Sequence, residues 1–396
     1  MVSAMQKAML LLACLVSAGF GRRVQPENPA AAFNPSAPAG QLASSKSTSG
    51  TTSPRVAARH ASNPVMAEDD AFGASHTSFY TDVKKKDKYD TLQEVLEAKM
   101  ADKELMQVTN TLFDGFATIT EALRKELVTV ADEQSSVFGD VQLGVDVLAD
   151  NLMWDICKTS ALIKEGASEE EPEVREMHAD GKFSICWDPL DGSSIVDNNW
   201  AVGTIIGVWP ASKGILGSTG RDQVVSMVAL YGPRTTVFIT LDDGVYEFTY
   251  GANGVDGWLC SREKITISET SKIFSPANMR AAQEVEGYNK LIDHWMTNKY
   301  TLRYTGGLVP DICQQFTKGM GVFANPTSKA SPAKLRLAFE AAPFGYLVEK
   351  AGGKTSNGID GASILDTEIT GIDQRTALTI GSAKEVERFN EMVLAK

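Results

Sequence analysis

The chain has 396 residues, of which 43% are hydrophobic and 22% charged, enough for one large or two ordinary domains with a real core. Its formal net charge of −12 argues against partners such as nucleic acid or an anionic membrane surface. The five cysteines form no Cys-x-x-Cys pair and only four histidines are present, so a zinc site is not expected. Buried thiols, rather than disulfides, are expected for Cys157, Cys186, Cys260 and Cys313.

The first 68 residues have the composition of a targeting segment. The short apolar run from Met9 to Val16 predicts a signal peptide over residues 1–20, too short to span a membrane as a mature helix. Residues 21–68 are rich in Ser, Ala, Thr and Pro and poor in acids, which is typical of a plastid transit peptide. We expect the two segments to direct the protein to the chloroplast stroma; ordinary secretion with a disordered spacer is the alternative.

Hydrophobic periodicity predicts helices and strands in the rest of the chain, with ordered structure beginning near Ser78. The first predicted helices cover residues 92–100, 105–127 and 143–163. The predicted strands that follow cover residues 183–187, 201–209, 224–231 and 234–240. A second half is expected to begin near Ile265, with helices over residues 288–296, 311–318, 343–350 and 385–393 and a strand over 378–380. Strands flanked by helices in both halves predict stacked α/β layers.

The most informative stretch is residues 187–194, Trp-Asp-Pro-Leu-Asp-Gly-Ser-Ser. An apolar run precedes it, so we expect Asp188 and Asp191 at the end of a buried strand, in a turn fixed by Pro189 and Gly192. Such a turn can aim both carboxylates at a hard cation such as Mg²⁺, which prefers oxygen ligands. A surface turn with two solvated aspartates is the alternative.

The backbone around the same turn adds further candidates. Because proline has no N–H, the turn is open and the Leu190 carbonyl is a candidate metal ligand. The N–H groups of Gly192, Ser193 and Ser194 are expected to face an anion, most simply a phosphate.

Other acids are spread widely over the chain. They are Asp140 with Asp146, Glu169 with Glu170, and Glu340. An acidic run such as residues 169–173 is commonly a solvated surface segment. Glu340 stands in an otherwise apolar segment, where a carboxylate is costly unless it is paired or bound to a metal. A salt bridge to Arg336 or Lys334 would explain Glu340 equally well.

Residues 188–194, together with Gly-Thr-Ile-Ile-Gly-Val-Trp-Pro at 203–210, resemble the fructose-1,6-bisphosphatase superfamily. Four further segments are similar to its sedoheptulose-1,7-bisphosphatase branch: residues 219–224, 231–236, 274–278 and 299–307. The resemblance runs from about Asp90 to the C-terminus. It implies an α/β (α+β) fold with α/β/α/β/α layers, a metal-binding catalytic sub-domain over residues 78–264 and a sugar-phosphate-binding sub-domain over residues 265–396.

The resemblance also implies a role for each site residue. Two or three Mg²⁺ ions would be held by Glu169, Asp188, the Leu190 carbonyl, Asp191 and Glu340. The attacking water would be oriented and deprotonated by Asp140, Asp146 and Glu170. The 1-phosphate would be bound by Gly192, Ser193 and Ser194. The distal phosphate and the sugar would be bound by Asn278, Arg303, Tyr304, Asn325 and Lys334, with the arginine often supplied by a neighbouring subunit, which implies a homodimer.

Two departures within the family pattern carry information. Residues 131–136, Ala-Asp-Glu-Gln-Ser-Ser, stand where the plant type has a Cys-Gly-Gly-Thr-Ala-Cys regulatory segment. Thioredoxin control through that disulfide is therefore impossible here. Asn325 stands where fructose bisphosphatases have a Tyr, and we interpret the smaller side chain as room for a seven-carbon sugar.

The implied activity is Mg²⁺-dependent hydrolysis of sedoheptulose 1,7-bisphosphate to the 7-phosphate and phosphate, a Calvin-cycle step. The chemistry is coherent, because a phosphate monoester carries about two negative charges near pH 7 that divalent cations neutralise while activating water. The alternatives are a fructose-1,6-bisphosphatase, a dual-specificity bisphosphatase, an inositol-monophosphatase-like enzyme, or a non-catalytic sugar-phosphate-binding protein. No nucleic acid is expected as a partner, and no membrane for the mature form.

Overall fold

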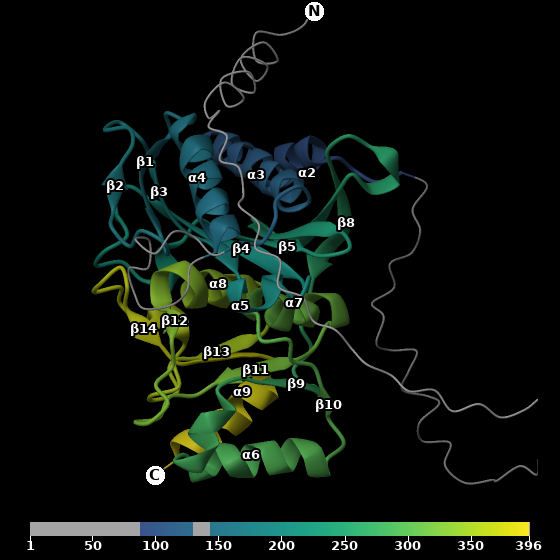
Figure 1. The fold of residues 1–396 in the computed structure, drawn as a ribbon, viewed down its shortest axis with the longest axis vertical. Helices are drawn as coiled ribbons and strands as arrows, with labels where there is room; N and C mark the ends of the chain where they lie inside the picture. The colour runs from purple at the N-terminus through teal and green to yellow at the C-terminus, as the bar shows by residue number, and fades with distance from the viewer. Residues whose placement is uncertain (1–87, 130–142, 396) are drawn as a thin grey trace, which may run out of the picture. The chain divides into compact units, whose positions relative to one another are not determined.

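The computed structural model describes residues 88–129 and 143–395. The predicted signal peptide, the transit-like segment, the expected start near Ser78 and the candidate Asp140 lie outside these residues. Figure 1 shows the described part as five layers, in the order helices, sheet, helices, sheet, helices. This confirms the predicted α/β/α/β/α arrangement. Within the described ranges, no helix is both long and apolar enough to cross a membrane.

The first layer consists of three helices: α2 (Leu92–Lys99), α3 (Lys103–Leu123) and α4 (Gly144–Lys158). Local capping explains where they begin. Thr91 and Glu94 form a reciprocal capping box at α2, and the Asp102 carboxylate accepts hydrogen bonds from the first N–H groups of α3. Each helix turns an apolar face toward the sheet beneath it.

An eight-stranded sheet forms the second layer, in the order β2-β1-β3-β4-β5-β6-β7-β8. Its strands are β1 (Ile163–Ser168), β2 (Arg175–Glu176), β3 (Phe183–Asp191), β4 (Val202–Pro210), β5 (Val225–Tyr231), β6 (Thr235–Leu241), β7 (Gly244–Tyr250) and β8 (Trp258–Ile265). Only β1 and β3 pair in parallel among these neighbours. Because both faces are covered, β3 and β4 are buried along almost their whole length.

The middle layer holds α7 (Leu308–Lys318), the π-helical turn Leu337–Ala341, α8 (Ala342–Lys350) and the four-residue helix α5 (Ser193–Val196). Side chains in β5 and just before it hold the start of α8: Ser226 donates to the Pro343 carbonyl at 2.7 Å and Gln223 to the Ala342 carbonyl at 3.0 Å. Gly203 lets α7 approach β4, because a Cβ there would lie 2.5 Å from the Val309 side chain.

A five-stranded sheet in the order β10-β9-β11-β15-β13 forms the fourth layer. Its strands are β9 (Ile273–Pro276), β10 (Thr301–Leu302), β11 (Val322–Asn325), β13 (Lys354–Ser356) and β15 (Leu378–Gly381). The last layer is α6 (Glu286–Thr297) with α9 (Ala383–Phe389) and a π-helical continuation, Asn390–Leu394. A small two-stranded sheet, β12 (Leu335–Arg336) with β14 (Arg375–Thr376), lies beside the π-helical turn.

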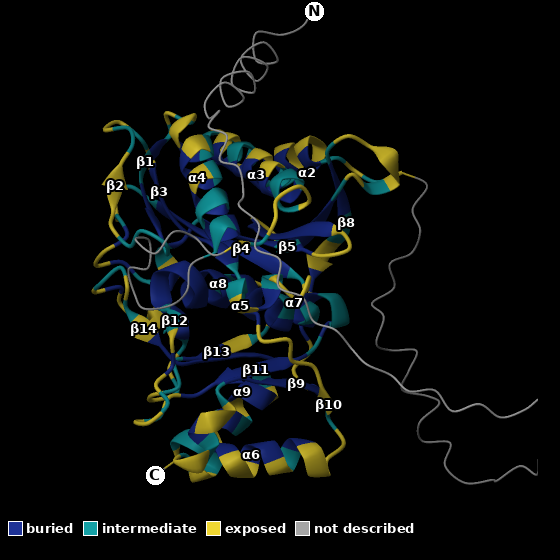
Figure 2. Ribbon diagram, viewed as in Figure 1, coloured by how far each residue is buried: buried dark blue, intermediate teal, exposed yellow. Residues whose placement is uncertain are grey.

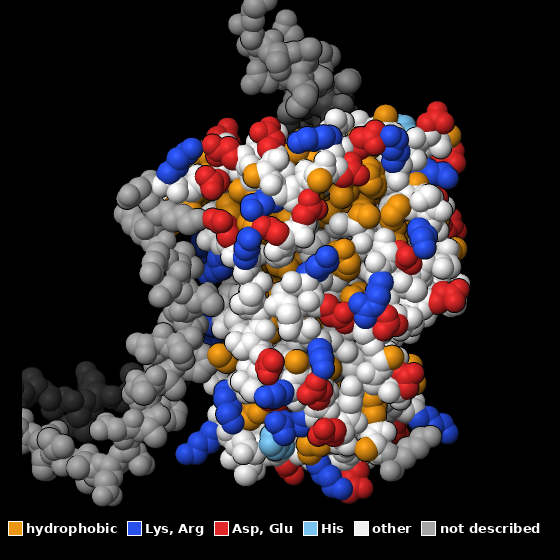
Figure 3. Space-filling model, turned by 180° about the vertical axis from the view of Figure 1, so that it is seen from behind, with side chains coloured by type: hydrophobic (Ala, Val, Ile, Leu, Met, Phe, Trp, Pro, Cys, Tyr) orange, Lys and Arg blue, Asp and Glu red, His pale blue; other side chains and the backbone are white. Residues whose placement is uncertain are grey.

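Three hydrophobic clusters hold the five layers together (Figure 2). One joins α2, α3 and α4 to the eight-stranded sheet, the second surrounds α7 and α8, and the third joins α6 to the five-stranded sheet. Alternate residues of β3 divide between the first two clusters, with Trp187 on one face and Cys186 on the other. The four cysteines expected to be thiols are buried and form no disulfide, as predicted. On the face seen in Figure 3, which is opposite to that of Figure 1, acidic and basic side chains are interspersed.

Most predicted elements are confirmed to within a few residues, and three predictions were wrong. The helix expected over residues 143–163 ends at Lys158, and Ile163 begins β1. Ile163 is fully buried and pairs with Phe183, so sheet formation overrides the continuing apolar pattern. Strands β1, β2, β7 and β8 of the large sheet and every strand of the two smaller sheets except β15 were missed. The expected turn at Asp188–Asp191 is a bulge inside β3, and the strand continues to Asp191.

Candidate active site

The bulge in β3 explains how the strand contains Pro189 and still places both Asp188 and Asp191 at the site. Register with β4 is regular up to Asp188 and resumes at Asp191, opposite Gly203. The Thr204 hydroxyl donates to the Pro189 carbonyl at 2.7 Å, and the Leu190 N–H donates to Asp188 Oδ1 at 3.0 Å. The candidate ligand Leu190 thus lies inside the bulge, between the two acids.

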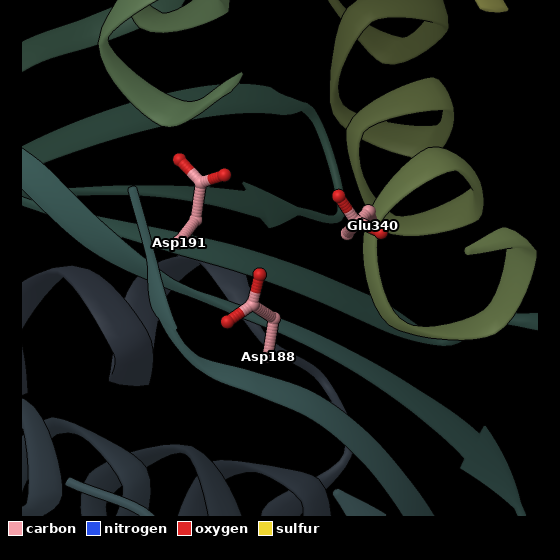
Figure 4. A group of neighbouring side chains, drawn as sticks. All are labelled: Asp188, Asp191 and Glu340. Atoms are coloured by element: carbon pink, nitrogen blue, oxygen red, sulfur yellow. The ribbon is translucent and has the colours of Figure 1, made fainter. Parts of the chain in front are cut away.

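The structure brings Asp188, Asp191 and Glu340 together, although Glu340 lies 149 positions after Asp191 in the sequence (340 − 191). One oxygen of each carboxylate lies within 4.8 Å of the others. Figure 4 shows Glu340 facing the two aspartates of β3 from the helical segment that precedes α8. Asp188 and Glu340 are 3% and 5% exposed, so these acids are largely removed from water.

Glu340 owes its position to the π-helical turn Leu337–Ala341. π-Helical turns are uncommon and frequently occur at functional sites. Glu340 Oε2 accepts the Arg336 N–H at 2.5 Å, so the side chain reaches back over the start of its own helix. The segment is otherwise apolar and fully buried, which leaves the carboxylate aimed at the acids of β3.

Glu169 joins the same group from the end of β1. Its N–H donates to the Trp187 carbonyl at 3.0 Å, and its carboxylate lies close to Asp188. The Arg336 guanidinium forms an ion pair with Glu169. The sequence suggested Arg336 only as a partner of Glu340, whereas its side chain reaches an acid that follows β1 of the large sheet. The signal that could have found it is a basic residue in an apolar segment four positions before a buried acid.

The electrostatics of the group reflect burial and crowded negative charge. Burial raises the pKa of Asp188, and the charges of Glu169, Asp191 and Glu340 raise it further. Burial also raises the pKa of Glu340, with Glu169 adding to the effect and Arg336 opposing it. The pKa of Asp191 rises to about 7 because burial outweighs two backbone N–H donors.

Asp191 links the large sheet to the middle helices. Its two carboxylate oxygens accept the N–H groups of Leu308 at 3.2 Å and Val309 at 2.7 Å, the first residues of α7. These donors are otherwise unsatisfied at a helix start and carry the positive end of the helix dipole. Asp191 is therefore held by α7 while it faces the other acids.

Of the three acids expected to handle the attacking water, the structure describes two. Asp146 lies in the first turn of α4, is 2% exposed, and accepts the Leu143 N–H at 2.9 Å through Oδ2. Its Oδ1 is buried without a hydrogen-bond partner among the described residues. Burial raises the pKa of Asp146 to about 7. Glu170 directly follows Glu169, and its N–H donates to the Ser168 hydroxyl at 3.3 Å.

The phosphate-binding candidates follow Asp191 directly. Gly192 has a φ of +97°, a left-handed conformation that glycine adopts without strain, and it ends β3. Ser193 and Ser194 then open the short helix α5. The chain therefore reverses next to the acid group and keeps these three residues beside it.

Four of the five residues expected to bind the distal phosphate and sugar lie at one edge of the five-stranded sheet. β10, β9 and β11 are parallel neighbours, so the residues that follow them lie at a common edge. Those residues are Arg303, Tyr304, Asn278 and Asn325, with Lys334 just before β12. Arg303 and Tyr304 are exposed, whereas Asn325 is 7% exposed.

Asn278 has a structural task that the sequence did not indicate. Its amide donates to the carbonyls of Pro326 at 2.8 Å and Ser331 at 2.9 Å, and its Oδ1 accepts the Ser331 hydroxyl at 2.6 Å. The side chain thus holds the loop that follows Asn325. With φ of +46°, Asn278 also occupies a backbone conformation that asparagine tolerates better than most residues.

The donor set fits a hard divalent cation. Glu169, Asp188, Asp191 and Glu340 lie close together and Arg336 forms an ion pair with Glu169, so negative charge is in excess among these described side chains. Oxygen-only donors without a thiol or imidazole suit Mg²⁺ rather than zinc. Glu169, Asp188, Asp191 and Glu340 are the side chains that would hold it.

Comparison with known proteins identifies the family. Residues 90–261 match the family model for the fructose-1,6-bisphosphatase N-terminal domain, and residues 267–394 match the model for its C-terminal domain. The chain is 44% identical over 306 residues to the chloroplastic sedoheptulose-1,7-bisphosphatase of Spinacia oleracea, covering 76% of this chain and 77% of the relative. A class 1 fructose-1,6-bisphosphatase of Geotalea uraniireducens is 40% identical over 262 residues, covering 65% and 82%.

Solved structures give the same result. A crystal structure from Toxoplasma gondii, provisionally assigned as a sedoheptulose-1,7-bisphosphatase, is 41% identical with a TM-score of 0.71, covering 76% of this chain and 98% of that one. The holo form of Leishmania major fructose-1,6-bisphosphatase is 28% identical with a TM-score of 0.70, covering 77% and 99%. The chain therefore belongs to the fructose-1,6-bisphosphatase family of sugar-bisphosphate phosphatases.

Proposed function

We propose that the protein hydrolyses sedoheptulose 1,7-bisphosphate to sedoheptulose 7-phosphate and phosphate, with Mg²⁺ as its cofactor. The observation that carries the proposal is the meeting of Asp188, Asp191 and Glu340 within 4.8 Å, next to a glycine-serine segment suited to a phosphate. Relatives at 43–44% identity bear the name of this activity.

Each part of the site has a chemical task in this proposal. Mg²⁺ bound there would neutralise the phosphate charge, acidify a water molecule and stabilise the leaving alkoxide. Glu169, Asp188, Asp191, Glu340 and the Leu190 carbonyl would hold two or three ions. Asp146, whose buried Oδ1 has no hydrogen-bond partner in the described part of the chain, and Glu170 would orient the attacking water and accept its proton. Asp140 completes this set, although it lies outside the described residues.

The two phosphates of the substrate would bind at the two groups of residues. The 1-phosphate would meet the N–H groups of Gly192, Ser193 and Ser194. The distal phosphate and sugar would meet Arg303, Tyr304, Asn325 and Lys334 at the edge of the small sheet. Asn278 contributes by holding the loop after Asn325, in addition to any direct contact. Residues 78–264 and 265–396 would form the two sub-domains that meet over the substrate, in a homodimer.

Parallel kinetics on the seven-carbon and six-carbon bisphosphates test the substrate. Phosphate release at varied Mg²⁺ should give a higher kcat/KM with sedoheptulose 1,7-bisphosphate, because Asn325 leaves more room than a tyrosine. Asn325→Tyr should shift the preference toward fructose 1,6-bisphosphate. A strong preference of the wild type for the six-carbon sugar would identify a fructose-1,6-bisphosphatase instead. No release with either sugar, with or without Mg²⁺, would favour a non-catalytic binding protein.

We further propose that the protein works in a plastid as part of the Calvin cycle. Its relatives from Spinacia oleracea, Triticum aestivum and Chlamydomonas reinhardtii are named chloroplastic. Fusing residues 1–87 to a fluorescent protein tests the location. Plastid fluorescence is expected, and secretion of the fusion would contradict the assignment.

A further inference from the structure

A buried aspartate that is not a proposed metal ligand contacts the residues that precede two of those ligands. Asp150 lies on α4, one helical turn after Asp146, and is 6% exposed. Asp150 forms no ion pair with any described residue. A buried carboxylate is costly unless hydrogen bonds satisfy it, so its contacts indicate what it does.

One carboxylate oxygen of Asp150 accepts hydrogen bonds from two neighbouring strands. Asp150 Oδ1 accepts the Ser168 hydroxyl at 2.5 Å and the Trp187 indole N–H at 3.0 Å. Ser168 ends β1, and Trp187 is its register partner on the parallel strand β3. Both donors belong to fully buried residues, and hydrogen bonds to an ionised acceptor are the stronger kind.

The residues that follow these two donors are the proposed ligands. Glu169 follows Ser168, and Asp188 follows Trp187. The contact also continues along the chain, because the Ser168 hydroxyl accepts the Glu170 N–H at 3.3 Å. Asp150 therefore fixes the backbone next to Glu169 and Asp188, the two proposed metal ligands, and next to Glu170, the proposed proton acceptor.

Aromatic packing keeps the Trp187 donor in place. The Trp154 ring, one turn after Asp150 on α4, meets the Trp187 ring edge-to-face with centroids 4.6 Å apart. The same helix therefore fixes the ring and accepts its N–H. α4 also carries Asp146, so Asp146 is held in the same frame as Glu169 and Asp188.

We propose that Asp150 is a positioning residue for the metal site: it sets the separation of Glu169 and Asp188 through Ser168 and Trp187, and so tunes the affinity for the divalent cation. The inference rests on the proposed Mg²⁺ site. Residues that orient metal ligands from behind typically change metal affinity or activity by about 10–100-fold when they are removed.

Calorimetric titration of the metal-free full chain with Mg²⁺ tests the inference without relying on activity. Asp150→Ala should raise the Kd for Mg²⁺ about 10–100-fold. Ser168→Ala removes one of the two hydrogen bonds and should raise the Kd by less. The double variant should bind no more weakly than Asp150→Ala, because both changes break the same link. Asp150→Asn keeps an acceptor oxygen in place and should recover most of the affinity.

Asp155→Ala is the matched control, since Asp155 lies on the exposed face of the same helix. It should leave the Kd unchanged. Thermal unfolding of each metal-free variant separates positioning from general stability: a purely structural role would lower Tm and leave the Kd unaltered. Wild-type Mg²⁺ affinity in both Asp150→Ala and Ser168→Ala would overturn this inference while leaving the proposed metal site intact. A wild type that binds no Mg²⁺ would reject the metal site itself, and the inference with it.

Discussion

At the scale of single residues, the site depends on side chains that satisfy unusual backbone. Pro189 has no N–H to donate to β4, and its carbonyl accepts a hydrogen bond from the Thr204 hydroxyl of that strand. Asp188 satisfies the Leu190 N–H, which keeps the bulge closed and the acid in place. The two acids of the motif thus differ in support: Asp188 is held by its own bulge and Asp191 by α7.

Replacing Asp191 by Asn should abolish turnover while the fold survives. The change removes one negative charge from the proposed ligands and turns an amide N–H₂ toward the N–H of Leu308 or Val309. We expect activity to fall by about a hundredfold or more, since even residues behind metal ligands cost up to that amount. Phosphate release measures the effect, and circular dichroism checks the fold. Asp293→Asn on the exposed side of α6 is the control. Near-normal activity of the Asp191 variant would contradict the site assignment.

Asp146 should make the metal-free protein less stable as pH rises. Its pKa is raised from 3.8 to about 7, so the folded state binds the proton more tightly than the unfolded state does. The stability from this group is therefore fully present below about pH 4 and is lost as pH rises through about 7. Asp146→Asn should reduce the fall in unfolding free energy between pH 5 and pH 7.5 by up to about 3 kcal/mol. Urea unfolding at the two pH values measures this; equal slopes for wild type and variant would exclude it.

At the scale of elements, the start of α7 connects the eight-stranded sheet with the segment that follows β10 of the five-stranded sheet. The loop before it is closed by Asp311, which is 1% exposed and accepts the N–H groups of Thr305 at 2.7 Å and Gly306 at 3.1 Å. The next residues supply the donors that hold Asp191. One helix start therefore orders both the segment after Tyr304 and a proposed metal ligand.

Asp311→Ala should destabilise this element. Two N–H groups of the exposed loop would lose their charged acceptor, and hydrogen bonds to charged groups contribute about 1.5–3 kcal/mol. We expect the unfolding free energy to fall by about 2 kcal/mol, with lower activity because Asp191 is no longer held in place. Urea unfolding and phosphate release are the measurements. Stability within about 0.5 kcal/mol of wild type, the range of ordinary surface changes, would show that the loop does not depend on Asp311.

At the scale of the whole molecule, five layers bring together acids that the chain keeps far apart. Glu169 directly follows β1 and Asp188 lies within the neighbouring strand β3 of the large sheet, whereas Glu340 comes from the middle layer. The second hydrophobic cluster packs both sheets against α7 and α8. Loss of this packing would separate the acids, so the proposed metal site is a property of the assembled layers rather than of either sheet.

The activity of the whole protein should be insensitive to thiol redox state. Cys157, Cys186, Cys260 and Cys313 are all buried, and burial raises the pKa of the Cys157 thiol to about 12, which suppresses the reactive thiolate. Residues 131–136 contain no cysteine. Incubation with oxidised or reduced dithiothreitol should leave phosphate release unchanged. A reproducible activation by the reduced form would reveal a switch elsewhere in the chain.

Local pattern was sufficient for much of this molecule. The apolar run before Asp188, the periodicity of α3 and β5 and the acid-rich motifs depend on neighbours in sequence, and they were predictable for that reason. The α4–β1 boundary and the bulge at Pro189 were not, because strand pairing with β3 and β4 overrides the local preference at both places.

The sequence by itself determined the composition of the site: which acids are present, that a Gly-Ser-Ser segment follows two of them, and that no cysteine pair stands before Asp140. Only the tertiary structure decided which acids lie close together, that Arg336 pairs with Glu169, and that Asp150 and α7 hold the segments that carry the proposed ligands. The physical reason is that these contacts join residues up to about 170 positions apart, and their energies come from layer packing that no local pattern contains.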